Sequence, residues 1–284
     1  MSAAAHEPEG VSEPASLERP GLRDALRGLG VSYGPSLLVD AWWLVSLVPA
    51  LRPAFLRHLS RPRRAAAVAV AAGALGPLVY HALARPRILF WGATREEMVR
   101  ELPGDAILPN PLFQETRAIT IHAPAAEVWK WLVQIAYGRG GWYSYDRPKA
   151  AAGAGDFREG RSATGIWPEP RELRVGDTVK VNAWSGMSVA VVSPGRLLVL
   201  HSLPGPQALA PTSTWAFVIE ANGPESVRLL VRGRSNPDPR NPFAQLMGHL
   251  LEVPLFVMER RMLLRLKKRA EAAHAAGGAS SGEA

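Results

Sequence analysis

The chain has 284 residues, enough for one or two domains, and its 47% hydrophobic and 20% charged residues are typical of a folded protein with a core. It contains no cysteine, which excludes disulfides, thiolate metal sites and a cysteine nucleophile. The net charge is +8, but no nucleic-acid-binding motif accompanies it, so we expect no nucleic-acid partner.

The chain begins with a polar lead, residues 1–34, whose Glu, Pro, Gly and Ala content predicts disorder. An apolar helical region, residues 35–84, follows. Within it, residues 65–84 carry no formal charge and have about the length of 20 residues that spans a bilayer. Arginines flank both ends, which suits an anionic lipid surface. The prediction is a membrane span; the alternative is a buried hairpin of soluble helices.

A weaker apolar stretch, residues 36–51, is interrupted by Asp40 and contains Trp42 and Trp43. It suits an interfacial helix or the first arm of a membrane hairpin. We therefore expect a membrane-associated protein, single-pass or hairpin, in an inner membrane. The nearly balanced arginines do not indicate on which side the soluble domain lies. Residues 85–111 are turn-rich and predict an irregular linker.

The periodic part of the chain begins with a strand at residues 117–122, in which Ile119 and Ile121 share one face. Pro124 then opens a helix. Its apolar stripe consists of Val128, Trp131, Leu132 and Ile135. The region that follows is rich in glycine and aromatic residues, and we expect a short helix near 144–152.

A run of strands follows, separated by short turns that contain glycine or proline, so neighbouring strands are expected to be antiparallel. The predicted strands are Thr178–Ala183, Met187–Val192, Leu197–Ser202, Thr212–Glu220 and Ser226–Arg234.

The domain closes with a long helix, capped by Asn241 with Pro242 at its first position and kinked at Pro254. Its predicted apolar stripe is Leu251, Leu255, Met258, Met262 and Leu266. Residues 276–284 are expected to be a disordered tail.

This order of elements, together with several strings, resembles the START-like, polyketide cyclase/dehydrase and lipid-transport superfamily, which includes Bet v 1-like proteins. The strings are RAITIHAPAAEVWKWLVQIAYGRGGWYSYD at 117–146, LRVGDTV at 173–179, STWAFVIE at 213–220 and FVMERRMLLRLKKRAE at 256–271. The resemblance is to a bacterial branch. It implies an α+β helix-grip fold at residues 112–275, with a curved antiparallel sheet around the C-terminal helix and an apolar pocket. It implies no particular reaction.

The glycine- and aromatic-rich run at residues 138–146 is the main candidate for the mouth of such a pocket. In this interpretation Trp142, Tyr143 and Tyr145 line the pocket, while Arg139 and Asp146 orient a polar end of the ligand. The alternative is that the aromatic residues seal the sheet against the helices and that Asp146 caps the next helix.

Six further residues are candidates for ligand contacts. They are Trp167, Glu169, His201, Trp215, Arg234 and Met258. Glu169 and His201 have acid–base chemistry, but a solvated glutamate and a half-buried strand histidine are the commoner cases. Arg228, Arg232 and Arg234 alternate along one strand, which favours a solvated outer face. Alternatively, Arg234 binds an anionic head group.

The function we expect is binding of a lipid-like or polycyclic small molecule beside a membrane, with membrane lipids as a second partner. A cyclase, dehydratase or hydrolase acting in the same cavity is the first alternative, and a membrane-tethered interaction module without ligand is the second. We expect no metal site and no cofactor, because the histidines are scattered and no dinucleotide or phosphate-binding motif occurs. The sequence does not indicate an oligomeric state.

Overall fold

A computed structural model describes residues 79–145, 162–167, 172–202, 212–237 and 241–281, together with the single residues 62, 68 and 76. Its helices are η1 (Tyr80–Ala84), α4 (Arg85–Leu89), α5 (Arg95–Val99), η2 (Asp105–Ile107), α6 (Ala125–Val133) and α8 (Pro242–Ser281). Its strands are β1 (Phe113–Ile121), β2 (Thr178–Lys180), β3 (Gly186–Ser193), β4 (Leu197–Ser202), β5 (Thr212–Ala221) and β6 (Val227–Asn236).

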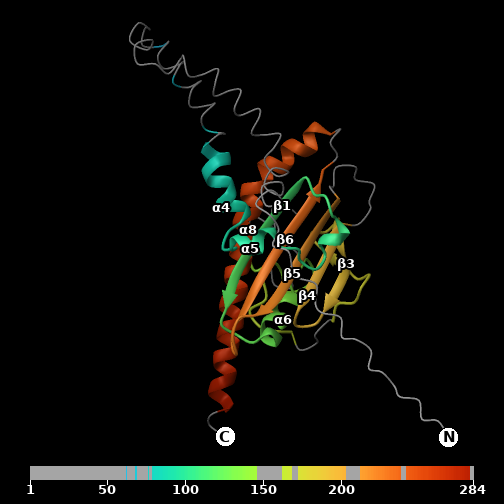
Figure 1. Cartoon of the computed structure of the whole chain (residues 1–284). Coiled ribbons are helices and arrows are strands. Elements are labelled where there is room, and N and C mark those ends of the chain that lie inside the picture. The colour runs from blue at the N-terminus through green and yellow to red at the C-terminus, as the bar shows by residue number, and fades with distance from the viewer. Residues whose placement is uncertain are drawn as a thin grey trace, which may run out of the picture.

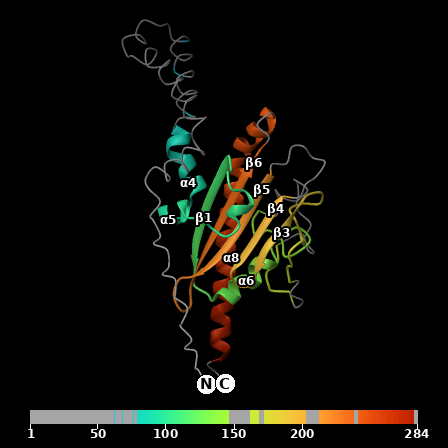
Figure 2. The same cartoon turned by 45° about the vertical axis from the view of Figure 1, so that its right-hand side comes forward.

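The strands form one six-stranded sheet in the order β1-β6-β5-β4-β3-β2, and every neighbouring pair is antiparallel. The first strand thus pairs with the last, and the remaining strands follow as a meander. The long helix α8 runs along one face of this sheet, which we call the inner face (Figures 1 and 2). This α+β arrangement is helix-grip-like, as the sequence resemblance implies.

The main hydrophobic core lies between the inner face of the sheet, α6 and the C-terminal half of α8. Alternation along the strands directs every second residue inward, and Ile119 and Ile121 of β1 belong to this core as predicted. The predicted stripe of α6 is buried in the same cluster. From α8, the core receives Met262, Leu263 and Leu266.

The predicted strands are confirmed, with end shifts of a few residues. The strand predicted at 117–122 begins four residues earlier, since β1 starts at Phe113, and the strand predicted at Thr178–Ala183 is shorter, since β2 ends at Lys180. Residues 181–185 form a turn instead, because the side-chain oxygen of Asn182 accepts hydrogen bonds from the backbone N–H groups of Trp184 and Ser185. The short helix expected near 144–152 lies outside the described residues, except for Ser144 and Tyr145, which are not helical.

Residues 85–111 are not the irregular linker that we expected. They contain α4, α5 and η2. Helix α4 contacts β1 and α8, whereas α5 and η2 belong to an outer layer over the opposite face of the sheet, which we call the outer face. A capping box between Thr94 and Glu97 starts α5. Gly92 has a φ of 74°, and a Cβ atom there would lie 2.1 Å from the carbonyl oxygen of Ala118, so glycine permits the close approach to β1.

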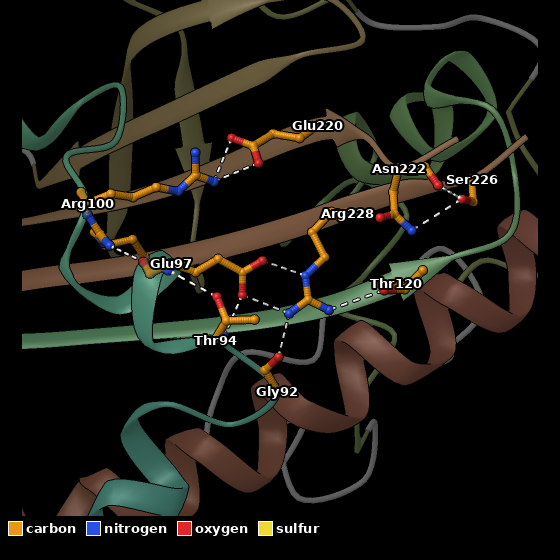
Figure 3. Close-up of polar contacts among 10 residues, drawn as sticks. Gly92, Thr94, Glu97, Arg100, Thr120, Glu220, Asn222, Ser226 and Arg228 are labelled. Carbon is orange, nitrogen blue, oxygen red and sulfur yellow. Dashed lines mark hydrogen bonds and ion pairs between the residues drawn. The ribbon is translucent and has the colours of Figure 1, made fainter. Parts of the chain in front are cut away.

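Ion pairs fasten this outer layer to the sheet. Arg228 of β6 binds both carboxylate oxygens of Glu97, and Arg100 binds Glu220 of β5 (Figure 3). Arg232 is 2% exposed and donates to Asp105 at 2.6 Å. The alternating arginines of β6 therefore do not form the solvated face that we expected, because the outer layer covers them.

Helix α8 begins at Pro242 as predicted, contains Pro254 and continues to Ser281, past the predicted end of the domain at residue 275. The ribbon changes direction toward the N-terminal end of the helix (Figure 1). Among the described residues, no helix combines the length and the apolar character that a bilayer crossing requires. Most of the predicted span at 65–84 and of the apolar region 35–84 lies outside the described residues, as does the lead at 1–34.

Candidate functional site

A cavity of about 650 Å³ lies between the N-terminal half of α8 and one end of the sheet. The start of β1, the start of β5 and the end of β6 form its sheet wall, and Arg85 and Leu89 of α4 lie at its side. The sequence predicted such a space because a long closing helix over an antiparallel sheet leaves a gap where their side chains do not meet.

The helix wall of the cavity is a stripe of apolar residues at spacings of three and four. Its members are Met247, Leu251, Leu255, Met258 and Met262. Leu251 and Leu255 are 47% and 54% exposed, whereas Met262 is 2% exposed. The predicted stripe of α8 is therefore one continuous helix face that borders the cavity at its first turns and enters the solid core at its last.

Aromatic residues form the boundary between the cavity and the core. Trp142 and Trp215 both line the cavity, and their rings stack at 5.9 Å between centroids. Phe217, which belongs to the core, packs against Trp215 at 4.7 Å. These flat, rigid surfaces suit contact with an apolar ligand.

A cluster of charged residues lies at the same cavity. The guanidinium of Arg117 is 1% exposed and donates to the Glu259 carboxylate at 2.7 Å and to the Glu115 carboxylate at 2.5 Å. Its Nε donates to the carbonyl oxygen of Ile88 at 3.0 Å. Both Glu115 and Glu259 line the cavity, so one arginine is shared between two carboxylates at an apolar wall.

A second ion pair joins α8 to α4 at the cavity. Arg85 Nε donates to both carboxylate oxygens of Glu252, at 3.1 and 3.0 Å, and both residues line the cavity. Tyr80 Oη donates to the same carboxylate at 2.8 Å. Arg85 is 1% exposed, so it is not part of the exposed basic surface that the arginine-rich sequence suggested.

Because Arg117 is shared between Glu115 and Glu259, its single positive charge does not neutralise both carboxylates. Burial, with a further contribution from the charge of Glu115, raises the pKa of Glu259 to about 7 despite its pairing with Arg117. Burial opposes the charge of Arg117, but attraction to Glu259 and Glu115 outweighs it, and the pKa of Arg117 is raised. Arg117 therefore stays protonated, while Glu259 can carry a proton near neutral pH.

Four of the predicted site residues line the cavity: Trp142, Trp215, Met258 and Arg234. The Arg234 guanidinium, however, donates to Gln114 Oε1 at 2.8 Å and to two carbonyl oxygens of residues 105 and 108 in the outer layer. These three hydrogen bonds hold its Nε and Nη1 groups against Gln114 and the outer layer.

Tyr143 and Arg139 hold the loop together and do not line the cavity. Tyr143 is fully buried, and its Oη accepts a hydrogen bond from Gln134 at 2.7 Å. Arg139 donates to the carbonyl oxygen of Val133 at 2.8 Å. The Gly-rich run turns tightly, as expected, because Gly138 and Gly141 have φ values of 69° and 78°.

The other predicted site residues lie elsewhere or outside the described residues. Tyr145 is in a separate groove on the far side of α8, with the Arg261 guanidinium 4.0 Å from its ring centroid. His201 alternates with the inward-facing Leu200 on β4 and does not line the cavity. Trp167 is in a loop, where its backbone N–H donates to Gln134 Oε1 at 3.3 Å. Asp146 and Glu169 lie outside the described residues.

Apart from Arg234, the charged residues of the cavity were not predicted from the sequence, although two signals were present. The alternation that directs Ile119 and Ile121 inward also directs Arg117 and Glu115 inward. Glu252 and Glu259 are seven residues apart on α8, so they share one side of the helix beside the apolar stripe. Among the described residues, no three His, Asp or Glu side chains are placed to hold a metal ion.

Comparisons with solved structures give matches over 55–58% of the chain. The matched structures include protein MLL2253 from Mesorhizobium loti, with 13% identity over 56% of this chain and 98% of the other, and a TM-score of 0.33. Norcoclaurine synthase from Thalictrum flavum, in complex with dopamine and hydroxybenzaldehyde, has 13% identity over 55% and 84% and a TM-score of 0.33. CalU16 from Micromonospora echinospora has 14% identity over 57% and 86% and a TM-score of 0.27.

No family model and no curated protein matches the chain. The description of the fold as helix-grip-like rests on this chain's own strand order and on the long helix against its sheet.

Proposed function

We propose that the domain binds an apolar small molecule, lipid-like or polycyclic, in the cavity between α8 and the inner face of the sheet. The observation that carries this proposal is the 650 Å³ cavity with an apolar helix wall and a stacked tryptophan pair. Small-molecule sites are typically about 300–1,000 Å³ and mostly apolar, with a few polar groups that fix orientation. Burial of apolar surface supplies the affinity, at about 25 cal/mol per Å² before the costs of association.

The test of this function is occupancy of the cavity. We expect the full-length protein to co-purify with an apolar molecule that solvent extraction and mass spectrometry detect. The Leu255→Trp variant fills the cavity, so it should lose most of the co-purified molecule. Leu264→Trp is the matched control, because Leu264 is exposed in the groove on the far side of α8. A wild-type protein that is always empty and does not bind a neutral fluorescent apolar probe would end the proposal.

We further propose that this binding takes place at a membrane. The predicted span at 65–84 ends with η1, and Tyr80 of η1 contacts Glu252 beside the cavity. Leu246, Leu250 and Val253 of α8 are exposed at the same end of the helix. A lipid surface at this end would cover exposed apolar side chains and place the cavity near the bilayer.

Carbonate washing of isolated membranes tests this second proposal. We expect the full-length chain to stay in the membrane fraction, because a spanning helix resists alkaline extraction. Release of the intact chain into the wash would contradict a span, while leaving the cavity and its ligand untouched. Release of a Leu246→Glu, Leu250→Glu variant alone would point to surface attachment through α8.

Acid–base catalysis in the same cavity is a second candidate function, favoured by one observation. Glu259, with its raised pKa of about 7, lies at the apolar cavity wall beside Glu115. A carboxyl group with such a pKa can donate or accept a proton near neutral pH. If the protein turns over its extracted ligand, Glu259→Gln should abolish turnover while weakening binding by no more than about tenfold, the size of one charge-assisted hydrogen bond, whereas His201→Gln should change neither.

A further inference from the structure

The charged groups around Arg117 do not balance. Three carboxylates, those of Glu115, Glu252 and Glu259, border the cavity. Arg85 pairs with Glu252, whereas Arg117 pairs with both Glu115 and Glu259. Within the Arg117 cluster, carboxylates therefore exceed cations by one.

Arg234 and His249 are the other described basic side chains beside the cavity. Arg234 borders the cavity, but its guanidinium lies 3.5 Å from the Asp105 carboxylate and hydrogen-bonds to Gln114 and to backbone carbonyls of the outer layer. His249 packs against Phe113 near Arg85. Burial, with repulsion from Arg85, lowers the pKa of His249, which keeps its imidazole neutral at pH 7.

Both carboxylates of the Arg117 cluster belong to residues that line the cavity, and each keeps one oxygen that Arg117 does not bind. Arg117 occupies Oε2 of both Glu115 and Glu259. Among the contacts of the described residues, Oε1 of neither carboxylate accepts a hydrogen bond. Glu115 lies flat against β6, since a Cβ atom on Gly233 would be 2.8 Å from Glu115 Oε1. Glycine at position 233 thus makes room for this carboxylate in the cavity wall.

From this arrangement we infer the polar chemistry of the ligand. The apolar molecule carries a hydrogen-bond-donating group without negative charge, a hydroxyl or a protonated amine, and binds it at Oε1 of Glu115 and Glu259. Carboxylate, phosphate and sulfate head groups are rejected. This inference rests on the proposed binding function and adds the class of ligand to it.

The physical reason is the low dielectric of the cavity wall. A donor there makes charge-assisted hydrogen bonds to a carboxylate that shares its only cation. An anion brought to the same place meets a carboxylate excess with little water to screen it, and like charges repel more strongly there than in bulk water. The raised pKa of Glu259 agrees with this view, because burial is its main cause and the charge of Glu115 adds to it.

The test compares three probes with one chain length: dodecylamine, dodecanol and dodecanoate. Each displaces the neutral dye Nile red from the full-length wild-type protein in non-ionic detergent at pH 7.5. We expect the amine and the alcohol to bind at least about tenfold more tightly than the carboxylate, the size of one charge-assisted hydrogen bond. Equal or tighter binding of dodecanoate by the wild type would overturn the inference without any variant.

Variants test which residue produces the preference for the amine probe over the carboxylate probe. Glu115→Gln removes the excess charge and should reduce the preference for the amine over the carboxylate by about tenfold. Glu225→Gln is the matched control, because Glu225 is exposed in the turn between β5 and β6, and it should leave the preference unchanged. A preference that survives Glu115→Gln would overturn the assignment to this carboxylate. Failure of Nile red itself to bind would overturn the proposed function, a result distinct from binding with the wrong charge preference.

Discussion

Both faces of the sheet bury an arginine against acidic side chains, but the surroundings of the two arginines differ. On the outer face, Arg232 meets five acceptors, which are Thr116, Asp105 and the carbonyl oxygens of residues 97, 98 and 100. A guanidinium has five N–H donors, so this one is fully satisfied. On the inner face, Arg117 is shared between two carboxylates that border the cavity.

The difference separates a structural arginine from one that shapes a binding site. The outer network closes on itself and leaves nothing for a ligand to contact. The inner cluster leaves carboxylate oxygens open toward a space that a small molecule can enter. Charge buried beside a cavity is thus a better guide to the site than buried charge alone.

The largest expected effect distinguishes the two arginines by stability. Arg232→Met leaves Asp105 buried without its cation and should lower the free energy of unfolding by about 3–5 kcal/mol. Arg117→Met should cost at least about 1 kcal/mol less, because Glu115 and Glu259 can take up protons or water at the cavity. Urea unfolding of both variants at pH 7 measures the difference, and the reverse order would contradict the contrast between the faces.

The second prediction divides α8 into its cavity end and its core end. Leu266 is fully buried, so Leu266→Ala should lower the free energy of unfolding by about 2–5 kcal/mol. Leu255→Ala removes the same atoms from a side chain that is 54% exposed and should cost less than about 1 kcal/mol. Thermal or urea unfolding compares them directly. Equal costs would mean that Leu255 is packed in solution and that the cavity is closed.

The sequence predicts the strands and the apolar face of α8 better than it predicts where the cavity lies along that helix. Alternation and turn residues gave the strands from Leu197 onward almost residue by residue, because short antiparallel strands depend on local signals. The stripe on α8 was also correct as one helix face. Its division into a cavity end and a core end was not predictable, since it depends on how far the sheet extends opposite each turn of the helix.

The candidate site was predicted less well, for physical reasons. Trp142, Trp215 and Met258 line the cavity as expected, because large apolar residues of a sheet and its helix face the same interior. Tyr143 was misplaced, because a buried tyrosine that satisfies its hydroxyl within the loop has the same sequence signature as a ligand contact. The outer layer over β6 was missed, because its ion pairs join residues more than 100 positions apart.

The third prediction concerns pH and tests the inner cluster alone. The pKa of Glu259 is higher in the folded protein, about 7, than its ordinary value of 4.5. The folded state therefore binds the proton more tightly, and the resulting stability is complete below pH 4.5 and is lost as the pH rises through 7. Relative to Glu259→Gln, the wild type should lose at most about 3 kcal/mol between pH 4.5 and 7.5. Guanidinium unfolding at several pH values measures it, and a wild type that gains stability over this range would refute the sign.

The smallest expected effect lies at the rim of the outer face. Arg100 and Glu220 pair at 2.6 Å, but their side chains are 34% and 36% exposed, so water screens the pair. A double-mutant cycle with Arg100→Gln and Glu220→Gln should give a coupling energy of about 0.2–1 kcal/mol. The backbone carbonyl of Arg100, which accepts from Arg232, is kept in both variants. A coupling of several kcal/mol would place the main attachment of the outer layer at its rim, and Arg232 would then no longer be the residue that holds this layer to the sheet.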